Sequence, residues 1–84
     1  MEGEKLNKIN TAKLKGKRAE VSYSMEMIAE KLGITRKGYE NKEKGVTEFT
    51  RPEILQLIVI FKLSVKDVYE IFFDSQLTEV LNKL

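Results

Sequence analysis

The chain contains 84 residues, with no Cys, no His and a formal net charge of +2 at pH 7. A chain of this length forms one domain and buries only roughly 60% of the surface that it exposes when unfolded, so it holds one small core and no deep catalytic cleft. The absence of Cys excludes disulfides and thiolate metal sites, and the absence of His removes the usual general base and the commonest metal ligand. We therefore expect no enzymatic activity, no metal and no cofactor.

The sequence also lacks the signals of membrane proteins and secreted proteins. No apolar stretch reaches the roughly 20 residues of a membrane span, and none follows a basic N-terminus as in a signal peptide. We therefore expect a cytoplasmic protein that acts neither at a membrane nor on a small-molecule substrate.

Charge is unevenly distributed along the chain. Residues 1–45 contain 11 basic and 7 acidic side chains, a net charge of +4, whereas residues 46–84 contain 4 basic and 6 acidic side chains, a net charge of −2. The second half is also far more apolar. This asymmetry is typical of a module that faces nucleic acid with one part and forms a core or binds a partner with the other, although charged residues also serve solubility alone.

The first residues are mainly polar, and we interpret residues 1–11 as a flexible arm or an extra helical turn. From Ala12, the apolar residues Leu14, Ala19 and Val21 alternate with basic residues in a pattern that predicts a short helix. The basic side of this helix is suited to a phosphate backbone, and it is equally suited to solvent.

The stretch from Ser24 to Gly45 predicts two short helices joined by a tight turn. Ser24 is a typical N-cap for the first helix, whose apolar residues recur at helical spacing. Gly33 favours the left-handed conformation that ends this helix, and Thr35 is a typical N-cap for the second. Two helices joined in this way form a helix-turn-helix, in which the second helix enters the major groove of DNA.

The strongest helix signals lie between residues 50 and 62. Thr50, Pro52 and Glu53 form the pattern of a capping box with proline in the first turn. The helix predicted from Glu53 to Lys62 is apolar nearly all round, which in a small protein indicates a second buried contact besides the core. Self-association and coverage by the terminal helices both account for this surplus of apolar residues.

A fifth helix is predicted after Ser64, with Val68, Ile71 and Phe72 at helical spacing. The last residues predict a short amphipathic helix, which must dock on another surface because it is too short to persist alone; a small hairpin is the alternative for these residues. The expected organisation is therefore an arm over 1–11, a helix-turn-helix domain over 12–74, and a C-terminal helical extension over 75–84 that is suited to dimerisation.

The second helix of the central pair, residues 36–44, carries the candidate DNA-reading side chains. Arg36 and Lys37 can donate to guanine O6 and N7, and Asn41 can pair with adenine N6 and N7. Lys42 and Lys44 flank the same surface and are suited to phosphate contacts. The alternative for this helix is a charged, solvated face without a ligand.

These features together resemble the Cro/repressor-type (lambda-repressor-like) helix-turn-helix family over roughly residues 14–72. The matching residues are Arg18, Ser24, Ala29, Gly33, Ile34, Thr35, Glu43 and Gly45. The run from residue 39 to residue 50 and the triplet Ile71-Phe72-Phe73 look like small Cro-like regulators of phages of Gram-positive bacteria. The resemblance implies an all-α, compact five-helix fold, a role as a repressor in a bacterial host cell, and insertion of helix 36–44 into the major groove.

The resemblance also implies roles for individual residues. Arg18 and Glu43 are expected to form a structural ion pair. The base-reading positions are Arg36, Lys37 and Asn41, and the expected contacts to the DNA backbone are Ser24, Met25, Lys42, Lys44 and Thr47.

Two of these positions depart from the family's pattern. The family usually has Gln, which contacts a phosphate, where this chain has Met25, and an apolar or aromatic residue where this chain has Lys42. With Met25 in place of Gln, Ser24 or the N-terminal amides of the helix have to bind that phosphate.

These features fit two functions. The first is a sequence-specific transcriptional regulator that binds double-stranded operator DNA as a homodimer. The alternative is a protein-interaction module that uses the helix-turn-helix as a scaffold. Met25 favours the alternative, whereas Arg36, Lys37 and Asn41 on one helix face favour DNA.

Overall fold

A computed structural model of the chain describes residues 9–73 and residue 81, and all of its regular elements are helical. In chain order they are α1 (Thr11–Val21), α2 (Met25–Leu32), α3 (Arg36–Lys44), α4 (Arg51–Ile60), α5 (Val65–Val68) and a π-helical turn, η1 (Tyr69–Phe73). No strand occurs among the described residues, so the all-α prediction is confirmed for this part of the chain. The extension predicted over 75–84 lies outside the described residues except for Leu81.

The polar side chains that precede the helices determine where the helices begin. The side-chain oxygen of each N-cap residue accepts a hydrogen bond from a backbone N–H three residues later, which satisfies one of the free donors of the first turn. The five N-caps are Asn10, Ser24, Thr35, Thr50 and Ser64.

The folded part begins earlier than the predicted boundary between residues 11 and 12. The N-cap of α1 is Asn10, and its backbone N–H donates to the carbonyl of Ile71 at 2.8 Å. Ile9 packs against the core. Residues 9–11 therefore belong to the helical domain rather than to an arm, because both a hydrogen bond and an apolar contact attach them to it.

The helix predicted from Glu53 to Lys62 extends instead from Arg51 to Ile60. Thr50 and Glu53 form the expected capping box, which places the start of the helix directly after Thr50. Lys62 adopts a left-handed conformation with a φ of 54°, so the chain leaves the helix before this residue.

The fifth helix is shorter than predicted and continues as the π-helical turn. A π-helix winds more loosely than an α-helix, so side chains adjacent in sequence differ less in direction. Ile71 and Phe72 are both buried, whereas Phe73 is exposed. The apolar spacing of the sequence predicted this burial but not the change of helix type.

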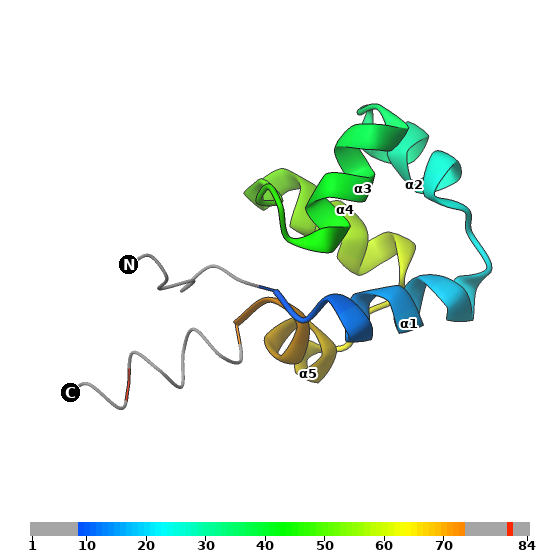
Figure 1. Ribbon diagram of the computed structural model, residues 1–84. Coiled ribbons are helices and arrows are strands. Elements are labelled where there is room, and N and C mark those ends of the chain that lie inside the picture. Colours follow the sequence, from blue (N-terminus) through cyan, green and yellow to red (C-terminus); the bar gives the residue numbers. More distant parts are fainter. Residues whose placement is uncertain (1–8, 74–80, 82–84) are drawn as a thin grey trace.

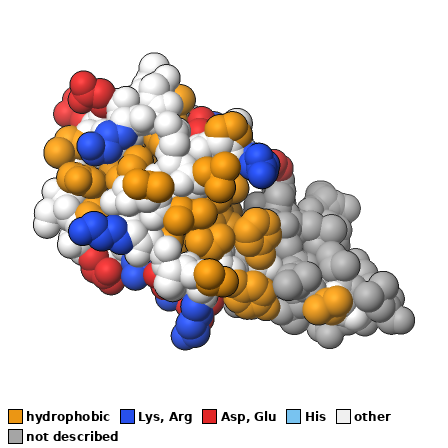
Figure 2. All heavy atoms as spheres, turned by 180° about the vertical axis from the view of Figure 1, so that it is seen from behind, with side chains coloured by type: hydrophobic (Ala, Val, Ile, Leu, Met, Phe, Trp, Pro, Cys, Tyr) orange, Lys and Arg blue, Asp and Glu red, His pale blue; other side chains and the backbone are white. Residues whose placement is uncertain are grey.

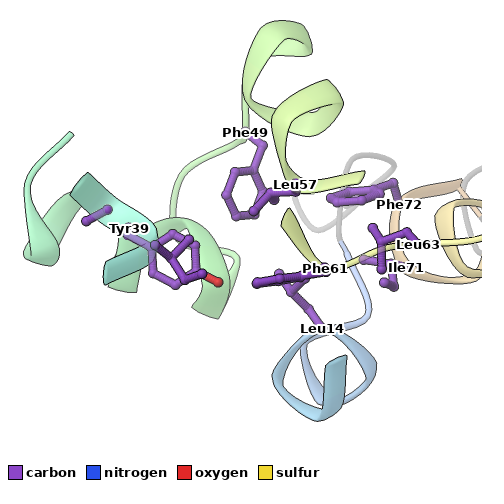
Figure 3. Close-up of a cluster of buried hydrophobic side chains, with 10 residues drawn as sticks. Leu14, Tyr39, Phe49, Leu57, Phe61, Leu63, Ile71 and Phe72 are labelled. Carbon is purple, nitrogen blue, oxygen red and sulfur yellow. The ribbon is translucent and has the colours of Figure 1, made fainter. Parts of the chain in front are cut away.

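One hydrophobic core joins all the elements. Figure 3 shows side chains from α1, α3, α4 and η1 pointing toward one another. Phe49, in the loop before α4, has its ring 6.0 Å from those of Tyr39 and Phe72, centroid to centroid. The buried apolar residues are Leu14, Ile28, Ala29, Tyr39, Phe49, Leu57, Phe61, Leu63, Ile71 and Phe72.

The arrangement leaves one side of α3 free of other elements. In Figure 1, α2 and α3 lie together at one end of the domain, with α1 and α5 along the opposite side and α4 between them. Only one face of α3 is buried, at Tyr39 and Glu43. The opposite face of this helix is the candidate site.

Candidate nucleic-acid interface

The turn between α2 and α3 has the geometry that the sequence predicted. Gly33 ends α2 in the left-handed conformation, with a φ of 76°, and Ile34 donates its N–H to the carbonyl of Ala29 at 3.0 Å. The hydroxyl of Thr35 accepts the N–H of Gly38 at 2.9 Å and so begins α3. A Cβ on Gly38 would lie 3.1 Å from this hydroxyl oxygen, so a larger residue would crowd the cap.

A buried polar network fixes the inner face of α3. Glu43 is 1% exposed and accepts hydrogen bonds from Arg18 Nε at 2.8 Å and from the Tyr39 hydroxyl at 2.8 Å. A second guanidinium nitrogen of Arg18 lies 3.2 Å from the other carboxylate oxygen, so the pair is bidentate. The pair expected between Arg18 and Glu43 is thus present, and it connects α1 to α3.

The same network keeps Tyr39 in its neutral, donating form. Burial raises the pKa of the Tyr39 hydroxyl, and the hydrogen bond to Glu43 raises it further. The hydrogen bond to Glu43 also raises the pKa of Arg18. The phenol and the guanidinium therefore both remain protonated and continue to donate to the same carboxylate across the physiological pH range.

Lys42 contacts another part of the protein rather than the free face of α3. Its Nζ lies 2.7 Å from Glu53 Oε1, and its side chain is only 16% exposed. The same oxygen of Glu53 accepts the backbone N–H of Thr50 at 2.9 Å, within the capping box of α4. Lys42 therefore connects the end of α3 to the start of α4, and a contact with phosphate would require this ion pair to break.

The other basic side chains of α3 are exposed on the free face. Arg36, Lys37 and Lys44 have side chains that are 54%, 72% and 50% exposed. They lie around the carboxylate of Glu40, which is 3.5 Å from the Arg36 guanidinium, 3.8 Å from Lys37 Nζ and 3.1 Å from Lys44 Nζ. The hydrogen bond and charge of Lys44, with the charge of Lys37, lower the pKa of Glu40, so its carboxylate is ionised at neutral pH.

Asn41 lies on the free face of α3 and is partly buried. Its backbone carbonyl accepts the N–H groups of Val46 at 2.8 Å and Thr47 at 3.4 Å. Its side-chain amide makes no hydrogen bond with another described residue, which leaves its donor and acceptor groups available. Thr47 is exposed beside it in the loop.

The N-terminus of α2 leaves only a few groups for a phosphate. Ser24 is exposed, but its hydroxyl already accepts the N–H of Met27 at 3.1 Å. Met25 is partly buried and packs against the core. The groups left for a phosphate at this end are the first backbone N–H groups of α2 and the hydroxyl hydrogen of Ser24.

The sequence interpretation did not include Glu40 among the site residues. A signal for it exists, because residues three and four positions apart are neighbours on a helix surface. Glu40 stands four residues after Arg36, three after Lys37 and four before Lys44. This spacing alone places one acid in contact with three bases.

Comparison with protein-family models, with curated proteins and with solved structures finds no match to this chain. Within residues 9–73 and residue 81, no group of three or more acidic side chains is arranged to hold a metal ion. None of the helices in this described part is long and apolar enough to cross a membrane.

Proposed function

We propose that the chain is a sequence-specific DNA-binding regulator with a lambda-repressor-like fold, and that it inserts α3 into the major groove. The observation that carries the proposal is the contrast between the two sides of α3. The inner side is fixed by buried contacts through Tyr39 and Glu43, and the outer side presents exposed Arg36, Lys37 and Lys44. A rigid helix with long cationic donors on its free face is what major-groove recognition requires.

The proposed roles divide between bases and phosphates. Arg36, Lys37 and Asn41 read base edges, because they lie on the first two turns of α3. Lys44, Thr47 and the N-terminus of α2 contact phosphates. Lys42 is assigned a structural role instead, since its ammonium group is paired with a carboxylate inside the protein.

We also propose that the regulator acts as a homodimer on a two-fold operator, in the cytoplasm of a bacterial cell. Figure 2 shows hydrophobic side chains gathered on one face of the molecule. The structure has an apolar groove of about 420 Å³ whose lining includes Ile58 of α4, Val65 and Val68 of α5, and Phe73 of η1. Val65 is 89% exposed. A second copy covering this groove would remove apolar surface from water and would give the assembly two α3 helices.

The dimer is tested by sedimentation at high micromolar concentration. We expect a mass that rises with concentration in the wild-type protein and remains at the monomer value in Val65→Lys. Val46→Lys serves as the control, because Val46 is an exposed valine in the loop after α3 and does not line the groove. A monomer mass at every concentration for the wild-type protein would contradict the dimer.

The DNA-binding function is tested by selection from a pool of random duplexes at moderate salt. We expect an enriched site with two-fold symmetry and half-sites about one helical turn apart. Arg36→Ala should weaken binding to that site by about 1 to 3 kcal/mol and relax the preference at one base pair. Lys66→Ala removes the same charge from α5 and is the control. Failure of the wild-type protein to enrich any site would rule out a specific regulator.

The alternative function is a protein-interaction module on the same scaffold. The observations that favour it are the apolar groove and the packing of Met25 into the core, where the resembling family places a phosphate contact. The two functions differ in the residues that matter. An interaction module would lose its partner through Val65→Lys and retain it in Arg36→Ala, and its wild-type form would enrich no DNA site.

A further inference from the structure

Glu40 is the one acidic side chain among three exposed bases on α3. Its Oε1 atom lies 3.5 Å from Arg36 and 3.8 Å from Lys37, and its Oε2 atom lies 3.1 Å from Lys44. In the proposed function, these three cations are the groups that approach DNA. The carboxylate therefore stands at the centre of the surface that would face the major groove.

A carboxylate in this position affects every DNA sequence that approaches α3. It is repelled by phosphates, and it can only accept hydrogen bonds. It also holds Lys44 and Arg36, so each cation must leave Glu40 to bind a phosphate or a base acceptor. The first consequence is weaker binding to DNA in general, because one of the favourable charges of the helix is cancelled.

A small number of base edges can nevertheless satisfy the carboxylate. Guanine N7 and O6 and thymine O4 are acceptors and leave a carboxylate unpaired, whereas the N4 amino group of cytosine and the N6 amino group of adenine are donors. Cytosine N4 is the better partner for Glu, because adenine N6 lies beside the acceptor N7, which repels a carboxylate. A guanine paired with that cytosine presents acceptors for Arg36 or Lys37 on the same base pair. Leaving the carboxylate unpaired at the other sequences is a penalty, and such penalties produce specificity.

We propose that Glu40 is a specificity-determining residue, which lowers the affinity of α3 for DNA in general and accepts a hydrogen bond from the N4 amino group of a cytosine in the preferred site. The inference rests on the proposed DNA-binding function. A simpler role is support of the helix through ion pairs three and four residues apart, which stabilise helices by only small amounts. The two roles predict different results for DNA binding.

The experiment compares the wild-type protein with Glu40→Gln, which removes the charge and keeps the size of the side chain. Each protein selects from the random duplex pool, and each is titrated with one unselected 20-base-pair duplex over a range of salt concentrations. For Glu40→Gln we expect roughly three- to tenfold tighter binding to the unselected duplex and a steeper salt slope, because one negative charge is removed from the surface that meets the phosphates. We also expect a cytosine preference in the wild-type site that the variant lacks.

Two further variants serve as controls. Glu70→Gln also removes a carboxylate that bridges two lysines, Lys13 and Lys66, but from η1 rather than from α3. It raises the net charge by the same amount and should leave the cytosine preference and the salt slope unchanged. Glu40→Asp keeps the charge and should retain the weak binding to the unselected duplex, which provides a measurement if Glu40→Gln folds poorly.

The outcomes separate this inference from the function on which it depends. If the wild-type protein enriches a site and Glu40→Gln enriches the same site with the same preference over the unselected duplex, the role of Glu40 is overturned and DNA binding stands. An equal effect of Glu70→Gln would also overturn it, because net charge alone would then explain the change. If the wild-type protein enriches no site, the proposed function fails and the inference fails with it.

Discussion

On each of the two faces of α3, acidic side chains pair with basic ones, but the pairs differ in their exposure to solvent. On the buried face, Glu43 is almost without solvent contact and bonds to Arg18 and Tyr39 at fixed distances. On the free face, Glu40 lies among cations whose side chains are half exposed or more. The side chain of Glu40 is 20% exposed and its partners are open to water, whereas Glu43 is only 1% exposed.

The difference in exposure separates the charges that support the fold from those available for binding. A buried ion pair is costly to break, because the remaining partner is left charged without solvation. An exposed pair contributes little and exchanges easily. The inner pairs therefore determine where α3 lies, and the outer cations can leave Glu40 for another anion.

The largest effect is expected from Glu43→Gln. This substitution leaves Arg18 beside an uncharged side chain in a largely buried site, and loss of one partner of a buried ion pair typically costs about 3 to 5 kcal/mol of unfolding free energy. Urea denaturation followed by circular dichroism measures this loss. We expect a lower midpoint without a change in slope, since the surface exposed on unfolding remains the same.

The matched control for this prediction is Glu20→Gln. Glu20 is also an acid paired with a base, Lys17, but its side chain is 68% exposed. Its substitution should change the unfolding free energy by less than about 0.5 kcal/mol. Similar losses for Glu43→Gln and Glu20→Gln would show that burial does not distinguish the two kinds of pair.

A smaller loss is expected from Lys42→Met. The methionine fills much of the space of the lysine stem but leaves the buried carboxylate of Glu53 with the Thr50 backbone N–H as its remaining donor. Loss of a partner from a buried polar group costs about 1 to 3 kcal/mol, which urea denaturation would again measure. The salt dependence of DNA binding should stay unchanged. A flatter salt slope in Lys42→Met would instead assign Lys42 to the phosphates.

Acid should destabilise the protein partly through the same pair. Burial opposes ionisation of Glu53, but hydrogen bonds from Lys42 and from the Thr50 backbone outweigh it and hold the pKa of this carboxyl below its ordinary value of 4.5. The folded state thus binds this proton less tightly than the unfolded state. Its contribution to stability is complete above the ordinary value and is lost as the pH falls through the lowered folded pKa.

Denaturation at a series of pH values between about 7 and 3 measures this loss. The stability of the wild-type protein should fall more over this range than that of Lys42→Met, because the variant lacks the ion pair that lowers the pKa of Glu53. Parallel stability curves for the two proteins would show that the pair does not contribute to acid sensitivity.

The sequence predicted the helices well because their signals are local. Four of the five N-caps belong to the patterns read from the sequence, and Gly33 and Gly45 both adopt the left-handed conformation at helix ends. The sequence did not indicate that the helical domain includes Asn10, because the contact that attaches it, from Asn10 to Ile71, joins residues far apart in the chain. The π-helical turn likewise depends on the core that it fills.

The sequence predicted which residue types the candidate site contains, but not which other residues of the protein they contact. Arg36, Lys37 and Asn41 lie on one segment, and their spacing is visible in the sequence. The ion pair of Lys42, by contrast, depends on Glu53, which is eleven residues away and belongs to another helix. Lys42 and Lys44 have similar sequence contexts, and only the tertiary structure shows that their environments differ.

The smallest effect on stability is expected from Lys44→Ala. This variant is also the closest comparison for Lys42→Met. Lys44 pairs with Glu40 on the free face and its side chain is half exposed, so its loss should change the unfolding free energy by less than about 0.5 kcal/mol. If the ammonium group binds a phosphate in the complex, its removal should weaken binding to all duplexes alike and flatten the salt slope by about one. Titrations of the selected and unselected duplexes at several salt concentrations measure both quantities. A loss confined to the selected site would instead make Lys44 a base-reading residue, and the outer face of α3 would then read sequence along its whole length.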